Sequence, residues 1–231
     1  AAVEEGRRVY DNLLKSLAFL LPTNLGLAFI LIWGIMFFPF NPFTKELLLP
    51  MLPTQLLWIN LIAAVALALP LAFEVQEHDI MRRPPRNPSA PLFNAFITFR
   101  VVFVSILMTV GTVAVFNFDY KNALEAGVEA AAAASKAQTM AVTFVIVFQI
   151  FYMLNCRSLR DSIFKIGWFS NQFVFVGIGS IVALQAMFIY LPIFQKIFNT
   201  TPLSLRDLAV TIGAGFLIFP VIGLVKLASK R

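Results

Sequence analysis

Charged residues are scarce in this chain of 231 residues. They make up 13% of it, which is half of the roughly one quarter that is typical of a soluble domain. Hydrophobic residues make up 59%, and the mean hydropathy is +0.83. Too little polar surface remains to cover a water-soluble globule. The composition therefore excludes a soluble domain and predicts an integral membrane protein.

Cysteine and histidine occur only once each, as Cys156 and His78. A single cysteine excludes an internal disulfide, and a lone histidine in a predicted loop is more typical of a surface residue than of a metal ligand. The sequence also lacks a nucleophile triad, a glycine-rich phosphate loop and a dinucleotide fingerprint. We therefore assign no catalytic residue to this chain, and the sequence leaves open whether it binds a metal.

Long unbroken apolar runs fill the chain, in place of the short alternating segments of membrane β-barrels. A helix needs ~20 apolar residues to cross a bilayer. Six runs have about this length: 13–38, 50–73, 93–117, 138–155, 172–192 and 207–228. They predict an all-α polytopic membrane protein, a bundle of six transmembrane helices that forms one domain over residues 1–231.

Two segments outside these runs are also predicted to be helical. Residues 1–15 are too polar for lipid and predict a short cytoplasmic stalk that continues into the first span. Their charged start, AAVEEGRRVYDN, is not a signal peptide. Residues 117–137 are rich in alanine, the best helix former, and predict a short external helix before the fourth span.

Basic residues are distributed unevenly between the two sides of the predicted bundle. Thirteen of the 18 Lys and Arg residues fall on the side of the chain termini. The positive-inside rule then places both termini in the cytoplasm. The same bias explains the net charge of +6 through contacts with lipid headgroups. We expect the lipid bilayer as a partner and no nucleic acid.

Polar residues within the predicted spans are few, and two of them are close to prolines. Asn24 follows Pro22 and Thr23 in the first span, and Asn60 precedes Pro70 in the second. Because proline leaves the carbonyl four residues back without its donor, such interrupted helices present oxygen atoms to an ion. The fourth span adds three candidates for the same cation path: Gln149, Tyr152 and Asn155.

Each of these residues also has a structural interpretation, since Asn and Gln often join transmembrane helices. Their combination with two interrupted helices favours an ion path. We expect no buried carboxylate, because Glu74, Glu77 and Asp79 fall at or beyond the cytoplasmic end of the second span. Divalent sites normally include carboxylates, so the sequence predicts a path of low charge.

Three motifs resemble a known family. The stretch PTQLLWIN, residues 53–60, resembles the QLLW-[IV]-N run of the type II P-type ATPases, the class of the calcium and sodium–potassium pumps. HDIMRRPPRNPSAPL, residues 78–92, resembles the loop after their sixth span, and AAVEEGRRVYDN resembles the entry to their fifth. The resemblance implies the carboxyl-terminal membrane domain of an ATP-driven cation pump, spans five to ten, located in the cell (plasma) membrane.

The phosphorylation motif D-K-T-G-T is absent from the sequence. The resemblance thus implies that this chain cannot hydrolyse ATP alone and holds no cofactor. The whole pump would use ATP and Mg, and its amino-terminal spans and cytoplasmic ATPase domains would be partners of this chain. The loop residues Arg82, Arg83, Pro84, Pro85 and Arg86 are implied to couple to those domains.

Carrying the family's ion ligands over gives a mixed result. Asn24 and Asn60 match amide positions of the family, whereas its carboxylates fall on Leu27, Ala64 and Gln149. The resemblance therefore implies a site without charge, which favours a monovalent cation. A divalent cation completed by ligands on other spans, and a divergent member that carries something else or nothing, are the alternatives.

The residues themselves leave two further classes open. One is a stand-alone scaffold or regulatory subunit made of the same six spans, and the other is an ion channel or carrier. Neither needs the rest of a pump.

Overall fold

The structure is a computed structural model that describes residues 2–39, 47–76, 80–81, 95–159 and 167–228. It is all-helical, with no strand among these residues, and six of its helical segments are long and apolar enough to cross a membrane. Both features confirm the predicted fold class. The six segments are Ala2–Phe37, Pro53–Ala72, Ala95–Glu125, Ala130–Cys156, Gln172–Tyr190 and Leu205–Leu227.

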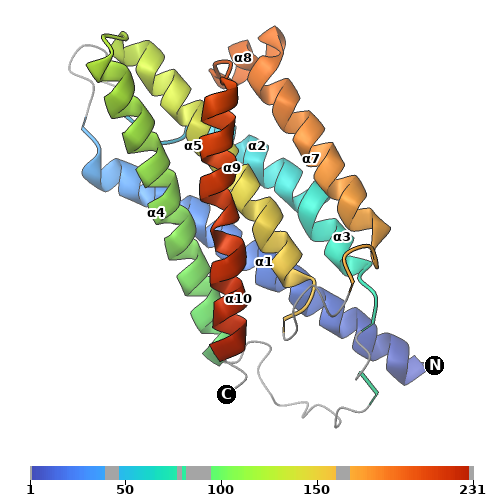
Figure 1. Cartoon of the computed structure of the whole chain (residues 1–231). Coiled ribbons are helices and arrows are strands. Elements are labelled where there is room, and N and C mark those ends of the chain that lie inside the picture. Colours follow the sequence, from blue (N-terminus) through green and yellow to red (C-terminus); the bar gives the residue numbers. More distant parts are fainter. Residues whose placement is uncertain (1, 40–46, 77–79, 82–94, 160–166, 229–231) are drawn as a thin grey trace.

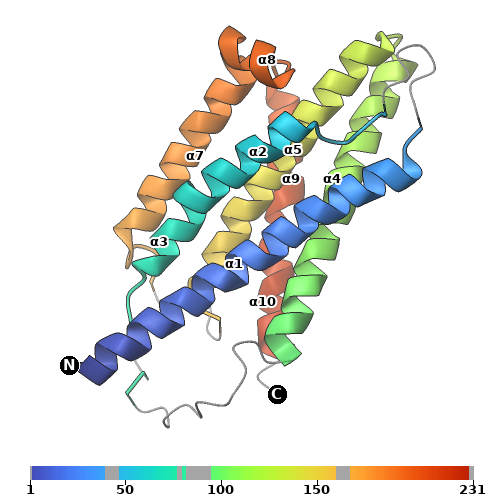
Figure 2. The same ribbon diagram turned by 180° about the vertical axis from the view of Figure 1, so that it is seen from behind.

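Helix α1 (Ala2–Phe37) is one continuous helix of 36 residues. At 1.5 Å per residue it is about 54 Å long, so the predicted stalk and the first span form a single rod. The start of α1 and the end of α10 (Ile218–Ala228) lie at the same end of the bundle, as Figures 1 and 2 show. We call this end the terminal end.

The second span changes its helical form along its length. It begins as α2 (Pro53–Ile62), widens into the π-helix η1 (Ala63–Ala68) and ends as α3 (Leu69–Ala72). The N–H of Leu69 donates to the carbonyl of Ala64, five residues back, which is the π-helical pattern.

The predicted external helix over 117–137 is wrong as a separate element. Helix α4 (Ala95–Glu125) and helix α5 (Ala130–Cys156) both extend into this region. Alanine and apolar residues continue each span, and a short turn at Gly127, with φ +78°, joins them.

One short helix lies at the opposite end of the bundle, and two helices form the last span. The short helix α8 (Pro192–Phe198), which the sequence analysis did not predict, follows α7 (Gln172–Tyr190). The last span consists of α9 (Leu205–Phe216) and α10, separated at Leu217. Pro220 explains this break, because it has no N–H to donate to the carbonyl of Phe216.

Helix α5 is the centre of the bundle. In the 18-residue apolar stretch of this helix, 83% of the residues are buried, compared with 22% in the corresponding stretch of the last span. It packs against α1, α4, η1, α7, α9 and α10, and it runs between the other helices in both views (Figures 1 and 2). The outer helices therefore hold the lipid-facing surface, and any group buried inside the bundle must lie close to α5.

Candidate cation path

The first proline places a backbone oxygen next to α5. Pro22 lies inside α1 and is buried, and the carbonyl of Ala18, four residues back, loses its usual donor. The hydroxyl of Tyr152 on α5 donates to this oxygen at 2.8 Å. Thr23 bonds within its own helix, to the carbonyls of Phe19 and Leu20 at 3.0 Å. The oxygen that the sequence predicts to be free is thus held by another predicted residue.

Gln149 lies one helical turn before Tyr152 on the same face of α5. It is fully buried, and neither its Nε2 nor its Oε1 has a hydrogen-bond partner among the described residues. A buried polar group without a partner costs about 1–3 kcal/mol. A side chain kept at such a cost in the centre of a membrane bundle is a candidate for an ion path.

The two asparagines of the predicted path lie elsewhere. Asn24 on α1 and Asn60 on α2 are both exposed at the surface of this chain, so the six helices alone do not enclose them in one pocket. Asn155 is buried, and its amide lies 3.3 Å from the carbonyl of Phe151 and 3.4 Å from that of Phe219. The second contact joins α5 to α10, which is a structural role.

The second proline, Pro70, lies two residues after the π-helix η1. Pro70 cannot donate to the carbonyl of Ala66, and Gly177 on α7 packs directly against that carbonyl. A Cβ built on Gly177 would lie 2.0 Å from the Ala66 oxygen, so only glycine allows this approach. The Nδ2 of Asn171 donates to the carbonyl of Pro70 at 3.0 Å. The span is therefore widened near Pro70, and it remains helical.

Arg100 is a buried cation, and it is one of the thirteen basic residues that the sequence analysis counted only for the topology. Its guanidinium lies over the ring of Tyr152, 5.3 Å from the centroid, and its Nη2 donates to the Sγ of Cys156 at 3.5 Å. Its Nε and Nη1 have no partner among the described residues. The signal in the sequence was its position, six residues inside α4 and next to apolar neighbours.

The expectation of no buried carboxylate is wrong. Glu74 is 1% exposed and pairs with Arg157, and Asp119 is 7% exposed at the opposite end of the bundle. There Lys136 bridges Asp119 and Asp207, with N–O distances of 3.0 and 3.2 Å. Both carboxylates lie near span ends, and each has a cationic partner. No group of three or more His, Cys, Asp or Glu side chains that could hold a metal occurs in the described part of the chain.

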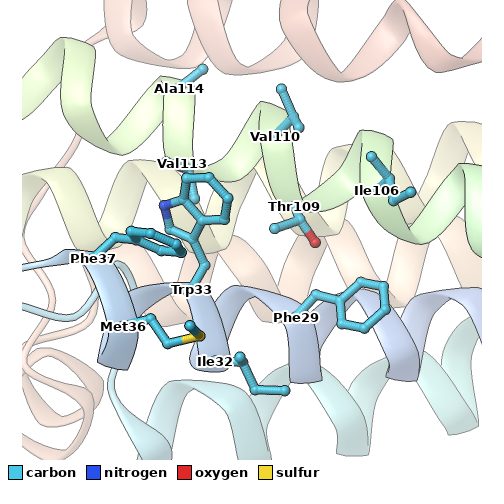
Figure 3. A pocket seen from close by; sticks show the side chains of 10 residues that line it. All are labelled: Phe29, Ile32, Trp33, Met36, Phe37, Ile106, Thr109, Val110, Val113 and Ala114. Atoms are coloured by element: carbon cyan, nitrogen blue, oxygen red, sulfur yellow. The ribbon is translucent and has the colours of Figure 1, made fainter.

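A groove of about 490 Å³ between α1 and α4 is almost entirely apolar (Figure 3). Its one hydroxyl, on Thr109, donates to the carbonyl of Ser105 at 2.8 Å, and Trp33 and Phe37 line its end. Without free oxygen atoms this groove suits hydrocarbon and does not suit an ion. The predicted coupling residues Arg82, Arg83, Pro84, Pro85 and Arg86 lie outside the described residues.

Comparison with known proteins assigns the chain to a family. The family model described as "Cation transporting ATPase, C-terminus" matches residues 48–228. The "Probable cation-transporting ATPase F" of Mycobacterium tuberculosis is 37% identical over 205 residues, which cover 89% of this chain and 21% of that protein. The chain belongs to the cation-transporting ATPase family, as its carboxyl-terminal membrane domain.

Two further relatives agree with this assignment. "Cation-transporting ATPase pma1" of Synechocystis is 30% identical over 91% of this chain and 22% of that protein. The "Calcium-transporting ATPase" of Bacillus subtilis is 29% identical over 92% of this chain and 22% of that protein. The chain spans about a fifth of the length of these curated relatives, and the resemblance to the P-type pumps is confirmed.

Proposed function

We propose that this chain contributes part of the ion path of an ATP-driven cation pump. The observation that carries the proposal is the buried amide of Gln149 on α5, which has no hydrogen-bond partner among the described residues. It lies one turn from Tyr152, the residue that bonds the Ala18 carbonyl of the proline-interrupted helix α1. An amide without protein partners in a membrane interior is available to an ion. The carbonyl of Ala18, which accepts from the Tyr152 hydroxyl, supplies a further oxygen atom next to α5, and Thr23 lies five residues further along α1.

Asn24 and Asn60 complete the path from the outer surface of this chain. Since the relatives are about four times as long as this chain, helices from the rest of the pump would cover these exposed amides. ATP and Mg would be used by its cytoplasmic domains, and the loop residues Arg82, Arg83 and Arg86 would couple the two parts. The uneven distribution of Lys and Arg supports a topology with both termini in the cytoplasm, and the plasma membrane is the location that we propose.

A monovalent cation is the preferred cargo. Of the two buried carboxylates among the described residues, Glu74 pairs with Arg157, and Asp119 shares Lys136 with Asp207. Both lie near span ends, whereas Gln149 lies within α5. A divalent ion, favoured by the name of the Bacillus subtilis relative, would need carboxylates from outside this chain.

Cation-stimulated ATPase activity of the full-length pump in proteoliposomes tests the proposal. Asn60→Ala and Gln149→Leu should each raise the cation concentration for half-maximal activation about tenfold, the effect of losing about 1.4 kcal/mol of ion binding. The apparent affinity for ATP should stay the same. Gln172→Leu, at an exposed amide, is the matched control. Strong activation by micromolar calcium that Asn60→Ala leaves unaffected would exclude the monovalent version.

A further inference from the structure

Glu74 and Arg157 form an ion pair in the interior of the terminal end. Arg157 donates from Nε to Oε2 of Glu74 at 3.0 Å and from Nη2 to Oε1 at 2.9 Å, and both side chains are 0% exposed. Glu74 follows the end of α3, and Arg157 is the residue at the end of α5. The pair therefore joins the second span to the central helix with the two-point geometry that only arginine provides.

The remaining polar atoms of the pair bind the start of α7. Arg157 Nη1 donates to the carbonyl of Trp168 at 2.7 Å, and Nη2 also donates to the hydroxyl of Ser170. Asn171, the residue that caps α7, donates from Nδ2 to Oε2 of Glu74 at 3.1 Å. Three separate segments thus meet at one carboxylate.

The first helix contacts the same point. Asn12, buried in α1, donates from Nδ2 to the carbonyl of Glu74 at 2.8 Å and to that of Ala72 at 3.1 Å. One turn further along α1, Ser16 donates to the carbonyl of Ala68 at 3.3 Å. Hydrogen bonds therefore connect α1, before Pro22, to the last residues of the second span, the span that contains Asn60.

Stability alone does not explain this arrangement. Removing two charges from water offsets most of their attraction, and well-packed apolar residues often serve a core equally well. A buried bidentate pair instead selects one geometry among its partners. We propose that Glu74 and Arg157 are positioning residues for transport, which hold α1, the Asn60 span and α5 together so that they move as one unit. This inference rests on the proposed function.

The experiment compares two charge-free double variants in the full-length pump. Glu74→Gln with Arg157→Gln removes the buried pair, and Glu5→Gln with Arg8→Gln removes an exposed pair of similar length, 2.9 Å. The readout is the ratio of ATP hydrolysis with and without a series of monovalent and divalent test cations, normalised to correctly assembled protein. This ratio should fall about fivefold or more in the buried variant, the lower range of site-to-site coupling, and stay constant in the exposed one.

Arg157→Lys provides a second variant, because lysine keeps the charge and loses the two-point contact. It should lower the ratio even where the double variant fails to assemble. An unchanged ratio in assembled Arg157→Lys or double-variant protein overturns the positioning role, since a merely structural pair lowers both rates together. A wild-type pump that no test cation stimulates overturns the proposed function itself.

Discussion

The hydrogen bond from Tyr152 to the carbonyl of Ala18 gives the sharpest test of how α1 and α5 fit together. The bond is 2.8 Å long and buried. Pro22, four residues after Ala18, has no N–H that could donate to the same carbonyl. Tyr152→Phe removes only the hydroxyl and leaves the ring in place. Pro22→Ala restores a backbone donor at the position from which an α-helix normally bonds this oxygen.

The expected magnitudes follow from which donors remain. With Pro22 present, Tyr152→Phe leaves the buried carbonyl of Ala18 unpaired, and we expect a loss of about 1–3 kcal/mol in the free energy of unfolding. In the Pro22→Ala background the N–H of residue 22 bonds the oxygen, so the same change should cost less than about 1 kcal/mol. The coupling between the two substitutions is then about 1–2 kcal/mol, well above the additivity error of distant sites.

Reversible unfolding in mixed detergent micelles measures the four free energies of this cycle. Tyr190→Phe is the control, because the Tyr190 hydroxyl bonds the carbonyl of Leu203 at 2.8 Å, far from Pro22. Its cost should be the same in both backgrounds. Equal losses for Tyr152→Phe with and without Pro22 would refute the idea that the phenol replaces the missing N–H.

Two further predictions concern single contacts. Gly177→Ala places a Cβ 2.0 Å from the Ala66 oxygen and should cost about 1–3 kcal/mol in unfolding free energy. The control Gly179→Ala, whose Cβ would have nothing within 4 Å, should be neutral or slightly stabilising. Equal effects of the two variants in thermal unfolding would contradict the close approach of Gly177 to Ala66. Lys136→Met should destabilise the end of the bundle opposite the terminal end by about 1–2 kcal/mol. This is less than for a fully buried ion pair, because the lysine is partly exposed. Adding Asp119→Asn to this variant should restore most of the melting temperature.

The number and type of the membrane helices could be predicted because run length and hydropathy are properties of the sequence itself. Their limits could not. Local composition alone predicts a separate helix over residues 117–137. In the structure α4 and α5 pack against each other and both continue into this region, so that only a turn at Gly127 separates them. Packing between neighbours decided where each helix ends.

Pro22 shows what local chemistry predicts and where it stops. The geometry of an α-helix identifies the carbonyl of Ala18 as the one that loses its donor, and the structure agrees. The partner of this oxygen is Tyr152, 134 positions further along the chain. Both residues were named as polar candidates from the sequence, but their pairing depends on how α1 and α5 pack, which no local pattern contains.

The burial of Glu74 was not predicted from the sequence for a related reason. Its position at the end of an apolar run is typical of a solvated carboxylate, since an isolated charge is costly to bury. Burial became possible because Arg157 and Asn171, 83 and 97 positions away, bring a charge and an amide to the same point. A carboxylate at a span end is therefore exposed or buried according to its distant partners, and the same reasoning applies to Asn24 and Asn60. Their exposure in this chain is a property of six helices, and the side chains that would face them determine whether they bind an ion.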